Sequence, residues 1–207
     1  MPVWPPITGS ISMTTGALKP LRSLTLLLGL LLALPSVAEW GPKALLASLA
    51  EAVQPELRFV EERHDELLGI PLRSEGRLEF RAPDYLAKTI ERGGDGSFVI
   101  EGDSLQVTRR GELHQIPLDS HPALRALATA LRASLGGDYA ALAEQFALEL
   151  RGEPAQWRLI LVPHQREVRR LLESLELGGS DARLLRISAY ERGGQRSVTT
   201  LIYPDGD

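Results

Sequence analysis

A short alternating stretch, residues 76–83 (GRLEFRAP), constrains the fold more than any other part of this sequence. Leu78 and Phe80 fall on one face of an extended chain and the charged residues beside them fall on the other, because side chains alternate across a strand. The stretch therefore predicts a strand with one apolar face and one solvated face. Such strands are typical of an antiparallel sheet that covers a core on one side only.

Alternating apolar runs recur along most of the chain, separated by turns that contain Gly or Asp. They predict strands over residues 56–66, 71–81, 85–91, 97–101, 104–109, 113–117, 146–151, 156–162 and 184–190, and a last strand that ends at Tyr203. Apolar residues at helical spacing predict short helices over residues 42–53, 122–135 and 139–145. Segment 165–177 fits either structure, and we favour a strand for its second half. The chain lacks the rhythm of a parallel doubly wound fold, so we predict a mainly β fold with short helices.

The first 38 residues have the pattern of a signal peptide. Lys19 and Arg22 precede a nearly uninterrupted apolar run over residues 24–34, which is roughly half of the ~20 residues that span a bilayer. Small residues at positions 36–38 permit cleavage before Glu39. We therefore expect export to the periplasm and one mature domain over residues 39–207.

An uncleaved anchor is the alternative to cleavage, and the missing stop-transfer pattern counts against it. Met13 is an alternative start of translation, because the residues before it do not resemble a leader.

Cysteine is absent from the sequence. The protein can therefore form no disulfide, no thiolate metal site and no lipid anchor at the cleavage site, and we expect a soluble mature protein. Removing the leader removes Lys19 and Arg22 and no acidic residue, so the net charge falls from -4 to about -6. A nucleic-acid partner is not expected, because such proteins need a basic face.

Catalytic and metal motifs are weak. Residues 102–105 spell the nucleophile motif of the GDSL hydrolases, yet no histidine follows His164 to act as a base, so we reject a hydrolase that uses Ser104. The four histidines, His64, His114, His121 and His164, are scattered, without the spacing of metal ligands. No phosphate-binding or dinucleotide motif is present. We predict no catalytic residue, no metal and no cofactor.

Two charged residues lie on otherwise apolar strand faces. Lys88 falls between Leu86 and Ile90, and Glu61 shares a face with Phe59. Charges on a concave apolar face are unfavourable unless they are paired or hydrated. The functional hypothesis is that Lys88, with Glu61, meets the polar head of an amphiphile. The alternative is a structural ion pair at a sheet edge, or a lysine that extends to solvent.

The predicted helix over residues 122–135 carries a leucine stripe, Leu124, Leu127 and Leu131. Such a stripe is usually part of a core. The functional alternative is a lid over the open end of a curved sheet.

The order of these patterns resembles the LolA-type lipoprotein carriers, and more closely a LolA-related branch. The resemblance rests on five features in their order along the chain: Phe59-x-Glu61, Gly76-x-Leu78-x-Phe80-x-x-Pro83-x-x-Leu86, a glycine-turned hairpin over residues 99–107, the junction Leu135-Gly136-Gly137-Asp138 between two helices, and Trp157-x-Leu159-x-Leu161-x-Pro163. It covers roughly residues 41–201.

The resemblance implies an unclosed antiparallel β-barrel covered by short helices, which carries acyl-bearing molecules through the periplasm. Its expected partners are an acylated lipid or lipoprotein and membrane donor and acceptor proteins, and the expected state is a monomer. The implied cavity lining is apolar and comes from strands and helices: Phe59, Leu78, Phe80, Leu86, Ile90, Leu124, Leu127, Leu131, Trp157, Leu159 and Leu161. A scaffold module of an envelope lipid-export complex is the alternative function.

One position departs from the family pattern. In lipoprotein carriers an arginine directly before the proline tethers the lid, and here that position is Ala82. The neighbouring Arg81 points to the opposite face of the strand, so it does not substitute. With only 5% aromatic residues, the cargo need not be a lipoprotein.

Overall fold

The computed structural model describes residues 40–64 and 69–204. The predicted leader, its cleavage site and the alternative start at Met13 lie outside the described residues.

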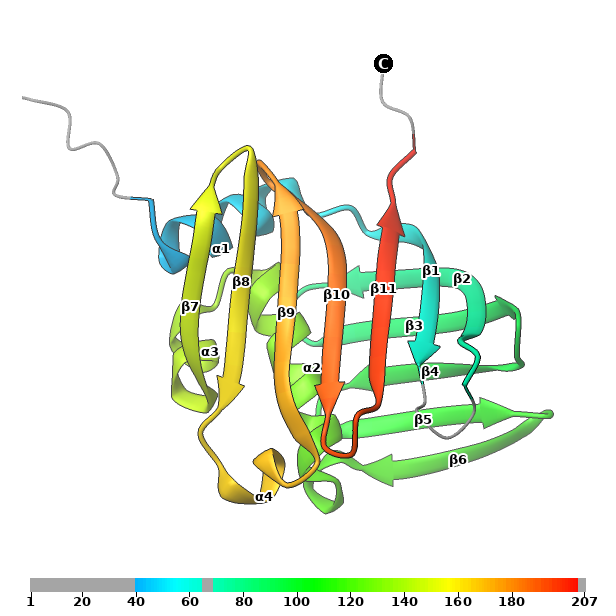
Figure 1. Ribbon diagram of the computed structural model, residues 1–207. Coiled ribbons are helices and arrows are strands. Elements are labelled where there is room, and N and C mark those ends of the chain that lie inside the picture. The colour runs from blue at the N-terminus through cyan, green and yellow to red at the C-terminus, as the bar shows by residue number, and fades with distance from the viewer. Residues whose placement is uncertain (1–39, 65–68, 205–207) are drawn as a thin grey trace, which may run out of the picture. The chain divides into compact units, whose positions relative to one another are not determined.

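One antiparallel sheet of eleven strands contains most of the described chain (Figure 1). The strands are β1 (Glu56–His64), β2 (Leu72–Arg81), β3 (Tyr85–Arg92), β4 (Gly96–Glu101), β5 (Ser104–Arg109), β6 (Glu112–Pro117), β7 (Phe146–Glu153), β8 (Gln156–Pro163), β9 (Leu172–Ser180), β10 (Arg183–Glu191) and β11 (Arg196–Ile202). Their spatial order is β6-β5-β4-β3-β2-β1-β11-β10-β9-β8-β7, so β6 and β7 are edges and the sheet does not close. The predicted fold class is confirmed.

Short helices cover one face of this sheet. Helices α1 (Pro42–Ala52), α2 (Pro122–Gly136) and α3 (Tyr139–Gln145) lie behind β7–β10 in Figure 1. Both α1 and α2 begin with proline, whose missing N–H is not needed in the first turn. Gly137 ends α2 in a left-handed conformation, and the Asp138 side chain accepts a hydrogen bond from the Ala141 backbone N–H at 3.0 Å to start α3.

The ambiguous segment at 165–177 contains both structures. A single helical turn, α4 (Arg166–Arg169), precedes β9, so the strand predicted for the second half is confirmed. Val168 is buried from the helical turn, and Leu175 and Leu177 are buried from the strand. The periodicity changes inside the segment, which explains why no single pattern fitted it.

The register of the sheet aligns a row of inward-facing side chains across six strands. In order from β7 to β1 the row is Leu150, Leu159, Leu177, Ile187, Thr199 and Glu61. The row is apolar from β7 to β10 and becomes polar at β11 and β1. The main core therefore lies where β7–β10 face the helices, and the polar end of the row is the first indication of a site.

Candidate functional site

The predicted lining residues mostly meet in one apolar core between the sheet and the helices. Those that are buried in it are Phe59, Leu78, Phe80, Leu86, Leu131, Trp157, Leu159 and Leu161. Ile90 and Leu127 are partly buried and pack against this core. Leu124 differs, because it is 38% exposed. It lies in the first turn of α2 and does not contribute to the interior.

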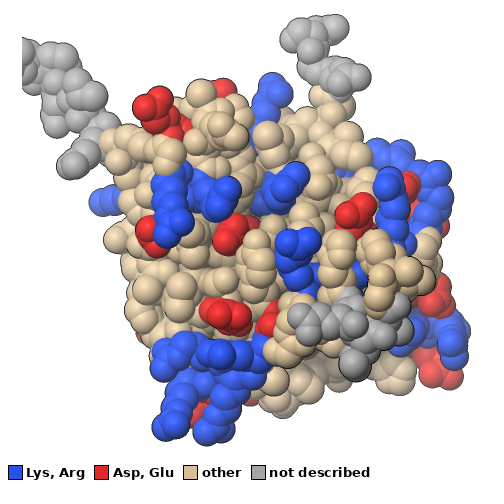
Figure 2. Space-filling view, viewed as in Figure 1, with Lys and Arg blue, Asp and Glu red and all other residues tan. Residues whose placement is uncertain are grey.

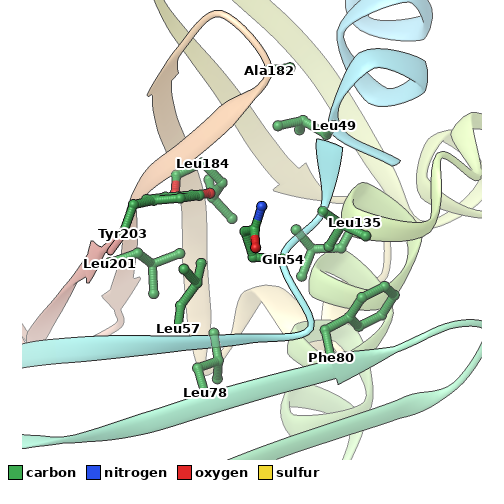
Figure 3. A pocket seen from close by; sticks show the side chains of 11 residues that line it. Leu49, Gln54, Leu57, Leu78, Phe80, Leu135, Ala182, Leu184, Leu201 and Tyr203 are labelled. Carbon is green, nitrogen blue, oxygen red and sulfur yellow. The ribbon is translucent and has the colours of Figure 1, made fainter. Parts of the chain in front are cut away.

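The interior retains a small cavity of about 20 Å³. This is roughly the space that one water molecule needs. Figure 3 shows its lining side chains, which come from β1, β2, β10, β11, the C-terminal ends of α1 and α2, and adjacent loop residues. Side chains thus fill the concave face in this conformation, and room for a larger molecule there would require the helices and the sheet to separate.

Several lining residues were missed by the sequence reasoning. They are Leu49, Val53, Gln54, Leu57, Leu135, Ala182, Leu184, Leu201 and Tyr203. Leu57 was accessible to prediction, because it alternates with Phe59, which was already placed on the inner face of the same strand. Leu201 lies on the last strand, whose inner face the sequence analysis did not assign. Leu49 and Leu135 depend on how the helices dock, which periodicity alone does not specify.

An arginine joins the helical cover to the sheet. Arg132 of α2 is half-buried, and its Nη1 donates to the backbone oxygens of Asp84, at 3.0 Å, and Gly102, at 2.8 Å. These oxygens belong to the β2–β3 and β4–β5 turns. The helix is therefore tied to two hairpins through one charged side chain, and such charge-assisted bonds are stronger than neutral ones.

Ala82 itself makes no such connection, and its neighbour does not replace the missing arginine. The Arg81 guanidinium lies 3.7 Å from the centre of the Tyr85 ring, on the exposed side of the sheet. Sequence reasoning did not identify Arg132. The available signal was a charged residue inside the Ala- and Leu-rich helix, directly beside Leu131.

The two predicted polar residues meet at the polar end of the core. Lys88 Nζ lies 2.5 Å from Glu61 Oε2, and Thr199 Oγ1 donates to the same oxygen at 2.8 Å. Lys88 Nζ also lies 4.8 Å from the centre of the Phe59 ring, a cation–π distance. The side chains are only 13% exposed for Glu61 and 25% exposed for Lys88.

The strand register explains how these residues reach one another. On β2, Ser74 lies opposite Glu61, Gly76 lies opposite Phe59, and Leu78 lies opposite Lys88 of β3. Gly76 therefore occupies the position between the two charges, and it has no side chain to separate them. A Cβ at Gly76 would lie 1.8 Å from the Thr89 backbone oxygen, so β2 and β3 approach closely at this point.

The environment of Glu61 shifts its acidity. Burial acts to raise its pKa, but the charge of Lys88 and the hydrogen bonds from Lys88 and Thr199 outweigh burial and hold the pKa below its ordinary value. The carboxylate is therefore ionised at neutral pH, and the pair is electrically neutral as a unit. Such a site suits a ligand whose head group is polar but carries little net charge, since a strongly charged head would leave one partner unpaired.

The rejected hydrolase motif has a structural surrounding of its own. Gly102 adopts a positive φ of 55° in the β4–β5 turn, and Ser104 Oγ accepts a hydrogen bond from Gln115 Nε2 at 2.9 Å. Within the described residues no histidine bonds this hydroxyl. Residues 102–105 therefore form part of a hairpin turn.

The solvated face of β1–β3 carries charges of both signs (Figure 2). Arg77 Nε lies 2.8 Å from Glu91, and Arg73 lies 3.1 Å from Glu75. These exposed pairs contribute little stability individually. These pairs identify the solvent-exposed face of the sheet. The apolar core and the Lys88–Glu61 pair lie on the opposite, concave face.

Comparison with known proteins gives a consistent family. A family model described as outer membrane lipoprotein carrier protein LolA-like matches residues 38–203. No match was found among curated protein sequences.

Solved structures provide distant likenesses. The LolA superfamily protein NE2245 from Nitrosomonas europaea is 10% identical over 79% of this chain and 92% of its own, with a TM-score of 0.44. A DUF1329 family protein from Desulfovibrio piger is 12% identical over 80% and 93%, with a TM-score of 0.42. The Mycobacterium tuberculosis lipoprotein LppX is 13% identical over 77% and 93%, with a TM-score of 0.36.

Proposed function

The chain belongs to the LolA-like family of outer membrane lipoprotein carrier proteins, and we propose that it binds the acyl chains of a lipoprotein or another lipid-like molecule in the periplasm and passes them toward the outer membrane. The observation that carries this proposal is the concave apolar face, which is covered by short helices and not by a second sheet. The protein acts as a carrier and not as an enzyme.

Loading exchanges one set of apolar contacts for another. Leu45, Leu46 and Leu49 of α1 are buried in the core that the cargo would enter. An acyl chain gains about 0.8 kcal/mol for each methylene that leaves water, but the displaced leucines lose comparable contacts. The net affinity is therefore lower than the buried area suggests. Reversible loading of this kind is what a carrier requires.

Arg132 is the connection that must break for the cover to open. Its two hydrogen bonds to the hairpin turns hold α2 against the sheet. Backbone oxygens freed by opening would meet water, so the connection can form and break without leaving a buried polar group unpaired. We assign to Arg132 the tethering role for which Ala82 is unsuited.

Lys88 and Glu61 are proposed to meet the polar head of the cargo. They lie where the inward-facing row changes from apolar to polar, so an acyl chain in the core would bring its head group to this point. Charge reversal in Lys88→Glu tests the assignment. Lipid binding and thermal stability that both remain unchanged would remove it.

The decisive experiment is analysis of the ligand that the mature protein carries. We expect protein purified from a bacterial periplasm to yield a stoichiometric acylated molecule by mass spectrometry. Ile90→Glu, which places a charge beside the core, should lose that molecule, whereas Thr89→Glu on the opposite face of β3 should retain it. A wild-type protein without any bound lipid, under conditions that preserve lipid on a known carrier, would contradict the proposal.

The filled interior favours a second candidate function, a binding or scaffold module of an envelope lipid-export complex. In that case the core is structural and the sheet's outer face contacts a transporter. Capture of a membrane protein by crosslinking, with no lipid in the purified chain, would favour this alternative. The carrier proposal includes a monomeric protein and membrane proteins that donate and accept the cargo. Within the described residues no helix is long and apolar enough to cross a bilayer.

A further inference from the structure

An exposed leucine follows α4 at one end of the sheet. Leu171 is 56% exposed, although its neighbour Leu172 is buried. Its position is fixed on both sides of the residue: the Leu171 N–H donates to the Val168 oxygen at 3.0 Å, and the Leu171 oxygen accepts from the Arg192 N–H at 2.9 Å. The backbone therefore holds this apolar side chain at the surface. A single exposed leucine is ordinary by itself, so its significance depends on the charged residues beside it.

Arginines surround this leucine. Arg169 donates through Nη1 to the Pro163 oxygen at 3.0 Å, and Arg192 donates through Nε to the Arg169 oxygen at 3.1 Å, so both side chains hold the segment together. Arg166 and Arg170 are exposed, and neither forms an ion pair within the part of the chain that the structure describes. Two guanidinium groups are thus free to bind an anion.

The distribution of charge sets this end apart from the rest of the visible face. In Figure 2 the lower left, where Figure 1 places α4, shows a dense group of basic side chains, whereas basic and acidic side chains alternate elsewhere. Glu167 and Glu173 belong to the same segment and reduce its net charge. The combination that remains is an apolar side chain in a fixed position, preceded in the sequence by two exposed arginines, Arg166 and Arg170, that form no ion pair within the described residues.

We propose that this end of the protein, formed by α4, Leu171 and the β10–β11 hairpin, docks on an anionic lipid surface. Leu171 enters the headgroup layer, and Arg166 and Arg170 bind lipid phosphates. Amphipathic surface anchors use this pairing of a shallow apolar insertion with basic side chains. The inference rests on the proposed function in one respect, because a carrier of acyl chains must approach a membrane. Docking itself requires no cargo.

Vesicle binding tests the proposal directly. Purified residues 39–207 are mixed with vesicles of phosphatidylcholine alone or of phosphatidylcholine with phosphatidylglycerol, and bound protein is measured by flotation. We expect roughly tenfold tighter binding to the anionic vesicles at low salt, and weakening of this preference in high salt because exposed charges are screened. Equal binding to both vesicles, or none to either, overturns the proposal.

Substitutions locate the surface. Leu171→Ser should lower the affinity for anionic vesicles on the order of tenfold, because a leucine side chain no longer leaves water. Leu113→Ser is the matched control, since Leu113 is 63% exposed on the edge strand β6. It should have no effect. Equal losses in both variants would show that exposed apolar area in general, and not this end, binds the vesicle.

The basic residues are tested in the same way. Arg166→Gln with Arg170→Gln should lower the affinity on the order of tenfold or more. Arg109→Gln with Arg110→Gln, which changes two exposed arginines in another part of the sheet, should not. Unchanged thermal unfolding in each variant excludes loss of fold. Binding that requires a membrane protein in the vesicle would overturn the lipid-surface assignment.

The outcome is separable from that of the carrier proposal. A protein that docks on anionic vesicles but contains no lipid after purification from the periplasm would retain this inference and remove the carrier function. A lipid-loaded protein that ignores vesicles would do the reverse.

Discussion

The most consequential pair of residues is Lys88 and Glu61, which share one short contact on the inner face of the sheet. A largely buried carboxylate needs its partner more than an exposed one does, because loss of the partner leaves an uncompensated charge. Thr199 and the Phe59 ring provide further contacts to the pair. The contribution of this ion pair to the free energy of unfolding can therefore be measured by substituting one of its residues.

Removal of the lysine should destabilise the fold. We expect Lys88→Met to lower the free energy of unfolding by about 1–3 kcal/mol at neutral pH, because Glu61 keeps its charge and loses its strongest bond. Urea unfolding checks this value. Arg77→Met is the control, since the exposed Arg77–Glu91 pair should contribute less than about 1 kcal/mol. Equal effects of the two variants would contradict the expected difference between inner and outer ion pairs.

The lowered pKa of Glu61 makes a prediction in acid. A carboxyl whose folded pKa is below its ordinary value of 4.5 contributes stability that is present above that value and is lost as pH falls through the folded pKa. Glu61→Gln removes this contribution. We expect the stability advantage of the wild type over Glu61→Gln to be constant near neutral pH and to shrink below about pH 4.5, as measured by thermal unfolding from pH 7 to pH 3. A difference that does not change with pH would be inconsistent with the shift.

Arg132 should control how easily the cover opens. Arg132→Met removes the bonds to the Asp84 and Gly102 oxygens, so amide hydrogen exchange in α2 should become faster and lipid exchange should accelerate. Arg125→Met on the same helix is the control, because Arg125 pairs with Asp119 at the surface. Unchanged exchange in Arg132→Met would show that packing alone holds the helix.

At the scale of elements, β2 depends on the absence of a side chain at Gly76. We expect Gly76→Ala to lower the free energy of unfolding by about 1–3 kcal/mol, because the new Cβ would overlap the Thr89 backbone oxygen and force β2 away from β3. Chemical denaturation measures the loss. Gly94→Ala is the control, since its Cβ would make only an ordinary contact with the Ile90 side chain. A neutral Gly76→Ala would mean that the strands separate freely.

The elements themselves were largely predictable from sequence. Strand alternation and helical spacing depend on local geometry, so β2 and α3 appear close to the residues expected. The docking of α2 was less accessible. Its buried face uses Ala126, Ala130 and Ala133, which bring the helix close to its neighbours and leave Leu124 exposed at the first turn. The sequence analysis considered the large apolar residues of this helix and therefore did not identify the contact that its alanines make.

The site was predictable only in part, for the same reason. Lys88 and Glu61 were conspicuous as charges on apolar strand faces. Arg132 was not, because its partners are backbone oxygens that no side-chain pattern reveals. The volume of the interior also escaped prediction, since it depends on how tightly α1 and α2 pack into the sheet.

At the scale of the whole described chain, the proposed carriage of a lipid requires the helices and the sheet to separate. The sequence contains no cysteine. Two cysteines that replace Arg132 and Asp103 can therefore be joined selectively by a short, reducible thiol crosslinker. We expect the joined protein to exclude lipid and the reduced protein to regain lipid binding. The same substitutions without crosslinker serve as the control. Lipid uptake by the joined protein would show that cargo enters without movement of α2.

The unpaired edges of the sheet determine what such movement involves. Within the described strands, β6 and β7 do not pair with each other, so the curve of the sheet is interrupted at one place. A closed barrel can widen only by breaking hydrogen bonds between neighbouring strands. Here the distance between the two edges can grow while every hydrogen bond between strands stays intact, so the sheet can widen at the expense of side-chain contacts alone.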